Sequence, residues 1–131
     1  MKIIKVLLVI ILFRSVNLFS YDWNIIHEAK YHNFHVIDSF DSLNYVISGK
    51  YSNTDQGHNF EIYTFILKTE NGGVNWETIW KDETKIPNDL FSYNITKLEM
   101  LSKDLIIAGL ESGLIIRTSN SGKTWDTTNF Q

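Results

Sequence analysis

The sequence predicts an all-β fold built from four-stranded antiparallel sheets, on three observations. The chain of 131 residues is 44% hydrophobic and 14% aromatic, with one Pro and no Cys, a composition typical of one globular domain without disulfides. Its apolar segments are short and rich in Ile, Val, Thr and aromatic residues, which favour strands. An eight-residue turn motif occurs twice, which indicates a repeated structural unit.

The first element in chain order is an expected signal peptide over residues 1–20. Basic residues precede an apolar stretch from Val6 to Phe13, which Arg14 closes, as in secretory signals. A membrane-spanning helix needs roughly 20 apolar residues, so no stable membrane span is expected. Cleavage removes three of the 12 basic residues and none of the 15 acidic ones, for a net charge of -6. We therefore expect an exported protein, periplasmic or secreted, that does not bind nucleic acid.

The turn motif lies at residues 69–76 and 118–125, and the two copies align without a gap. Their Trp residues are 49 positions apart. Asn at the third position can form an Asx-turn and Gly at the fifth can adopt a positive φ, so each copy predicts a tight hairpin. We assign a structural role to Thr69, Asn71, Gly73, Asn75, Trp76, Thr118, Asn120, Gly122, Thr124 and Trp125.

Strand-like segments precede each turn in the same order, and a fourth strand follows each motif. Residues 35–40 correspond to 95–100, residues 44–49 to 104–109, and residues 63–67 match 114–116. The sequence therefore predicts two units of four strands each, over about residues 33–82 and 94–131. A lone outer strand is expected over about residues 22–28, because the sequence from Trp23 parallels that from Trp76 and Trp125.

A period of roughly 40 to 50 residues with four strands per unit is typical of β-propeller blades. Residues 21–131 therefore predict a partial propeller of two complete blades plus one extra N-terminal strand. Two blades alone leave large apolar faces in water. The chain is then either part of a longer propeller or a homo-oligomer whose propeller closes between chains.

The motif resembles the Asp-box, or BNR repeat, with the pattern Ser/Thr-x-Asp-x-Gly-x-Thr-Trp. This repeat occurs in propellers of sialidases, sortilin-type receptors, some endoglucanases and photosystem II assembly factors. The second copy departs from it only at Asn120, and the first at Asn71 and Asn75. In that family the boxes lie at the blade periphery as folding elements, so the resemblance, over residues 22–131, implies fold more than function.

A complete sialidase site cannot be built from this chain. In that family three arginines bind the substrate carboxylate, and after signal removal only Arg117 remains. Glycoside hydrolysis in general needs two suitably separated carboxyl groups. The available carboxyl groups, for which solvated turns and strand ends are the simpler interpretation, are Asp38, Asp41, Asp55, Glu61, Asp104 and Glu111.

Neither a metal nor a cofactor is expected, because His27, His32 and His35 fit no standard ligand spacing. The connection at residues 52–59 is longer than its counterpart at 111–113, and extra loop length often marks recognition. The candidate contacts to a glycan or peptide in this loop are Asp55, Gln56, His58 and Asn59. A tolerated polar insertion is the alternative interpretation.

The expected function is that of an exported, non-catalytic propeller module for protein or glycan binding or for assembly scaffolding. Two alternatives stay open. The chain is the N-terminal fragment of a sialidase-like or other glycoside hydrolase propeller, or it is a two-blade lectin that closes by oligomerisation.

Overall fold

The computed structural model describes residues 30–53, 61–82 and 94–129. The expected signal peptide and the lone strand at 22–28 lie outside them. Within the described ranges there is no helix, and the strands are β1 (His32–Ser39), β2 (Tyr45–Asn53), β3 (Glu61–Thr69), β4 (Glu77–Lys81), β5 (Ile95–Met100), β6 (Ile106–Leu110), β7 (Leu114–Thr118) and β8 (Asp126–Asn129).

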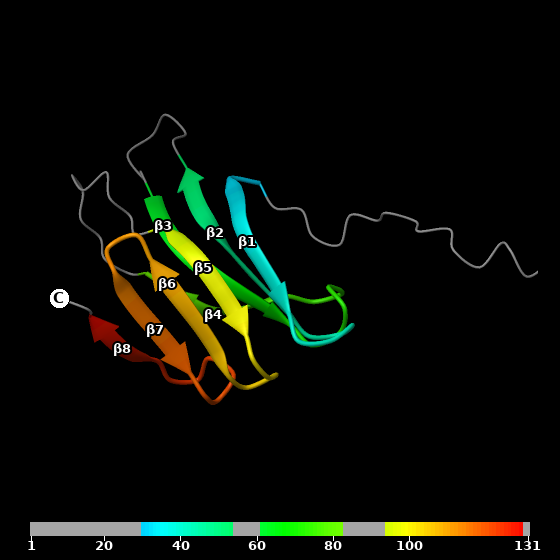
Figure 1. Cartoon of the computed structure of the whole chain (residues 1–131). Coiled ribbons are helices and arrows are strands. Elements are labelled where there is room, and N and C mark those ends of the chain that lie inside the picture. Colours follow the sequence, from blue (N-terminus) through cyan, green and yellow to red (C-terminus); the bar gives the residue numbers. More distant parts are fainter. Residues whose placement is uncertain (1–29, 54–60, 83–93, 130–131) are drawn as a thin grey trace, which may run out of the picture.

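The strands form two antiparallel meanders, in which each strand pairs with its neighbours in sequence. The first sheet has the order β1-β2-β3-β4 and the second sheet has the order β5-β6-β7-β8 (Figure 1). Alternation of side chains produces the β6 pattern, in which Ile106, Ala108 and Leu110 are buried and the residues between them are only half-buried. The prediction of an all-β fold with two four-stranded antiparallel sheets is confirmed.

The first three strands of the two sheets share their register. Tyr45 pairs with Thr69 in the first sheet, and Ile106 pairs with Thr118 in the second. The first strand of each sheet also has a register shift at the same point, after Phe34 and after Ile95. Equivalent positions are therefore 61 residues apart in the first two strands and 49 apart in the third. In the fourth strands this offset ends, because the pairing of β3 with β4 shifts register between Ile66 and Leu67 and the pairing of β7 with β8 does not.

This register corrects two expected correspondences by one residue each, that of residues 35–40 with 95–100 and that of residues 44–49 with 104–109. Gly49 pairs with Phe65, whereas Gly109 pairs with Ile115. Counted from the paired Thr residues of the turns, Gly109 is equivalent to Ser48 and not to Gly49. Because side chains alternate between faces, a slip of one residue assigns every side chain of the strand to the wrong face.

The core lies between the two sheets. Val46 and Ile66 of the first sheet are fully buried there, together with residues of β5, β6 and β7. Trp80 and Ile79 of β4 pack against this cluster from the edge. Residues of the second sheet in the cluster are Ile95, Leu98, Met100, Ile106, Ala108, Leu110 and Ile116.

The two sheets stack in the same sense, that is, both face the same way along the stack. The face of the first sheet that meets the second sheet is therefore not equivalent to the face of the second sheet that meets the first. Paired residues of neighbouring strands share a face, and Val46 of the first sheet is buried against the second. Its equivalent in the second sheet, Ile107, is only half-buried and lies on the face that points away from the core. We call the two faces that meet the covered faces and the other two the outer faces.

The outer face of the first sheet is rich in aromatic side chains. The Phe65 ring contacts His32 and Phe34, with ring centroids 5.0 and 6.0 Å away. Tyr51 stacks on Tyr63 at 4.7 Å. Phe65 is thereby only 1% exposed although it points away from the second sheet. This cluster supplies the first sheet with its own apolar layer.

Candidate functional site

The turn between β3 and β4 is held by side chains of the first motif. Thr69, only 1% exposed, donates its hydroxyl to Asn71 Oδ1 at 2.9 Å and accepts the backbone N–H of Gly73 at 3.0 Å. Asn71 Oδ1 also accepts the N–H of Asn75 at 2.9 Å. These bonds give the Thr69 hydroxyl and the Asn71 amide oxygen partners within the turn, which lowers the cost of removing them from water.

The turn between β7 and β8 has the same hydrogen bonds. Thr118 donates to Asn120 Oδ1 and accepts the N–H of Gly122, both at 2.9 Å. Asn120 Oδ1 accepts the N–H of Thr124 at 3.0 Å, and its amide donates to the Thr124 hydroxyl at 2.8 Å. The last bond is accepted by the Thr124 hydroxyl, and the first motif has Asn75 at this position.

Two successive residues in each turn adopt left-handed backbone conformations. In the first turn these are Gly72 and Gly73, with φ of 69° and 92°, and in the second Ser121 and Gly122, with φ of 60° and 88°. A positive φ is unusual for Ser. The sequence pattern points to the glycines at the fifth position but gives no sign of strain at Ser121.

Ser121 is fixed by a network that crosses the interface between the sheets. Its N–H donates to the Asp104 carbonyl at 3.0 Å, and its hydroxyl lies 2.6 Å from Asp104 Oδ1. Lys68 of β3 donates to the same hydroxyl from the other sheet at 3.1 Å and also pairs with Glu70. The contacts hold Ser121 in its uncommon conformation and join the second turn to the first sheet.

The Trp of the second motif, Trp125, also bridges the sheets. Trp125 Nε1 donates to the Ile79 carbonyl of β4 at 2.9 Å and lies 3.1 Å from the Gly122 carbonyl. Gly122 itself is so close to β4 that an added Cβ would lie 2.6 Å from Ile79 Cβ. The absence of a side chain is therefore required here by both φ and packing.

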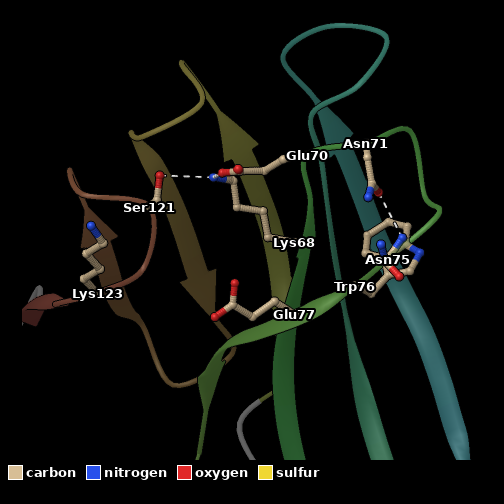
Figure 2. Close-up of a pocket in the computed structure, with 8 residues that line it drawn as sticks. All are labelled: Lys68, Glu70, Asn71, Asn75, Trp76, Glu77, Ser121 and Lys123. Atoms are coloured by element: carbon tan, nitrogen blue, oxygen red, sulfur yellow. Dashed lines mark hydrogen bonds and ion pairs between the residues drawn. The ribbon is translucent and has the colours of Figure 1, made fainter.

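A polar pocket of about 500 Å³ opens between the two turns (Figure 2). It carries both signs of charge, with amide groups and one indole beside them. The described residues that line it are Lys68, Glu70, Asn71, Asn75, Trp76, Glu77, Ser121 and Lys123.

Lys68 is the central charge of this pocket. Its side chain is only 4% exposed, and Glu70, at 67%, reaches it from the solvent side (Figure 2). An ion pair of this kind offsets part of the cost of burying an ammonium group. The pair can hold a polar ligand by charge and hydrogen bonds, and it already links the two sheets through Ser121.

The described carboxyl groups that were available for glycoside hydrolysis are engaged in separate structural contacts. Asp41 accepts the N–H groups of Leu43 and Asn44, which together with the Asn44 amide lowers the pKa of its carboxyl. The other described candidates have one principal partner each. These pairs are Asp38 with Met100 N, Glu61 with Lys81, Asp104 with Ser121, and Glu111 with Asn94.

The remaining predicted residues lie apart from the pocket or outside the described ranges. Asp55, Gln56, His58 and Asn59 of the expected ligand loop fall at residues 54–60, as His27 falls before residue 30, and none of them is described. His32 lies in the aromatic cluster. Arg117 is exposed on the outer face of the second sheet. Among the residues that the structure places, no group of three His, Cys, Asp or Glu side chains forms a metal site.

Sequence reasoning missed Lys68 and Ser121. A Lys between Leu67 and the buried Thr69 in an apolar strand is a detectable signal, because strand alternation directs it into an interface. Ser121 looks like an ordinary turn residue.

Comparison with known proteins yields no family model, curated protein or solved structure that matches the chain. The described residues contain no helix that is long and apolar enough to cross a membrane.

Proposed function

We propose that this chain is an exported, non-catalytic β-propeller-type module of the Asp-box kind, which binds a protein or glycan or acts as an assembly scaffold. The observation that carries the proposal is the same-sense stacking of two sheets through their motif turns. Propeller blades are four-stranded meanders that pack in this way around an axis. Same-sense stacking also leaves one face of each kind open to a further unit.

The arrangement of strands favours propeller blades as the architecture, rather than a sandwich of two sheets related by a two-fold axis. β1 and β5 lie side by side, and β4 and β8 form the opposite edges of their sheets (Figure 1). In a propeller the first strands of neighbouring blades meet near the axis and the fourth strands form the rim. The turns with Trp76 and Trp125 lie next to the fourth strands, as Asp-boxes lie at the blade periphery.

The absence of catalysis is proposed from the engagement of the described carboxyl groups. A glycosidase needs two carboxyl groups facing one substrate, about 5 to 10 Å apart. Asp38 instead accepts a backbone N–H within the sheet interface, and Asp104 holds Ser121. The rival, a glycoside hydrolase whose catalytic blades lie outside these residues, predicts further boxes and an arginine triad encoded in frame after Gln131.

Ligand binding is proposed at the pocket between the turns. Asn75 and Lys123 offer donors there, Glu77 offers acceptors, and the Trp76 indole is an amphipathic surface. This mixture suits a polar ligand such as a glycan or a peptide. It supports equally the module and its second alternative, an oligomeric two-blade lectin.

A glycan array and a panel of fluorogenic glycosides test the proposal together. We expect binding without turnover, weakened by Asn75→Ala in the pocket and unchanged by Lys103→Ala outside it. Turnover of any glycoside that Asp38→Asn and Asp104→Asn abolish would reject the non-catalytic assignment. Glycan binding unaffected by Asn75→Ala and Lys123→Ala would reject the pocket as the site.

A further inference from the structure

One row of residues on the outer face of the second sheet matches the row by which the first sheet holds the second. Strand pairing places Glu99, Ile107 and Arg117 next to one another across β5, β6 and β7. The equivalent row across β1, β2 and β3 is Asp38, Val46 and Lys68. Both rows read acid, aliphatic residue, base.

Each member of the row in the first sheet contacts the second sheet. Asp38 Oδ2 accepts the N–H of Met100 at 2.7 Å. Val46 is 0% exposed in the shared core. Lys68 donates to Ser121 of the second turn. In this row Asp38 supplies an acceptor at the β1 edge of the sheet, Val46 supplies an apolar group at the centre, and Lys68 supplies a cation near the turn.

The matching row of the second sheet is open. The Glu99 side chain is 49% exposed and pairs only loosely with Lys97, at 3.5 Å. Arg117 is exposed and Ile107 half-buried. In this row an acceptor, an aliphatic group and a cation therefore face solvent at the positions that carry contacts in the first sheet.

The surface that such a row fits is also present on this chain. Leu98 and Ile106 of the second sheet receive the first sheet and are 3% and 0% exposed. Their equivalents in the first sheet are Ile37, which is 54% exposed, and Tyr45, which is half-buried. The first sheet thus presents an apolar outer face at the positions through which the second sheet is held.

We propose that the outer face of the second sheet docks onto the outer face of the first sheet of a second copy, head to tail. The inference rests on the proposed same-sense stacking, which it extends from within the chain to between chains. A second copy is the favoured occupant because each copy carries both halves of the interface, with the charged row at one end of the stack and the apolar face at the other. Heterologous contacts of this kind close into rings when the rotation allows.

Two single substitutions test this head-to-tail docking of two unlike faces. Arg117→Glu disables the row of the second sheet, and Ile37→Lys disables the apolar face of the first; both side chains are exposed, so folding is preserved. Size-exclusion chromatography with light scattering is run on the full chain, on each variant and on their mixture. Arg117→Ala replaces Arg117→Glu if the charge reversal beside Asp126 impairs folding, and Lys103→Glu is the matched charge-reversal control.

The wild-type chain and Lys103→Glu are expected to form a discrete oligomer. Each disabling variant is expected to weaken association by about tenfold or more, equal to 1.4 kcal/mol, and the mixture to give a one-to-one dimer through the intact faces. A monomeric wild type, or variants that associate as it does, would overturn the docking. If nuclear Overhauser effects between Trp125 and Ile79 persist in that case, the proposed stacking within the chain survives; if they are absent, both proposals fail.

Discussion

Gly122 combines two constraints that substitutions can separate. It has a positive φ and lies against Ile79, whereas Gly113 also has a positive φ, of 81°, but has nothing within 4 Å of its added Cβ. Gly113→Ala is expected to cost only the conformational penalty, about 1–2 kcal/mol. Gly122→Ala adds overpacking of about 1–3 kcal/mol. Urea unfolding of both variants measures the difference, and equal losses of stability would contradict the close approach of the second turn to β4.

Asn120 stands where the Asp-box has Asp, and the geometry accepts either. Asn120→Asp keeps the acceptor for the Thr118 hydroxyl and the Thr124 N–H and makes it charged, which strengthens such bonds. The carboxylate cannot donate to the Thr124 hydroxyl as the Asn120 amide does, but the hydroxyl can rotate and donate to the carboxylate instead. We expect an unchanged or raised urea midpoint at pH 7. Asn120→Ala leaves the Thr124 N–H and the Thr118 hydroxyl without this partner and should cost about 1–3 kcal/mol. An Ala variant as stable as the wild type would show that the side chain does not hold the turn.

At the scale of elements, the loop between β1 and β2 is stabilised by an ionised carboxylate. Hydrogen bonds from Leu43 and Asn44 lower the pKa of Asp41 below its ordinary value of 3.8. A lowered pKa in the folded state means that the contribution is present above the unfolded-state pKa and is lost as pH falls through the folded one. We expect a downward step in stability below about pH 4, which Asp41→Asn removes because an amide does not titrate. An identical acid profile in both proteins would contradict this assignment.

Elements were predictable where the signal is local. Alternating Ile, Val and Thr segments predict the strands, and the spacing of Asn71 and Gly73 locates a turn between β3 and β4. The alignment of Gly49 with Gly109 was wrong by one residue, because the connections 52–59 and 111–113 differ in length and two similar Gly-ended strands offer no internal check of register. Lys68 and Ser121 meet only through the stacking of the sheets, which local pattern does not encode.

At the scale of the whole molecule, the shared core couples the two sheets. Ile66 is fully buried between them and contacts the cluster that includes Ile106 and Ile116. Ile66→Ala should cost about 2–5 kcal/mol, as buried truncations do. Because the core is common, amide hydrogen exchange should accelerate in β6 as well as in β3. Exchange that accelerates in the first sheet alone would mean that the sheets unfold independently.

The same-sense stack brings the Trp125 indole proton of the second sheet to the Ile79 carbonyl of the first, with the nitrogen 2.9 Å from the oxygen. Nuclear Overhauser spectroscopy on the labelled chain reports this contact in solution. The stacked arrangement predicts cross-peaks from the Trp125 indole proton and from Gly122 Hα to the Ile79 side chain. A folded chain that instead shows contacts between the Ile107 side chain and Ile66 would have its second sheet reversed, and the proposed propeller geometry would be wrong.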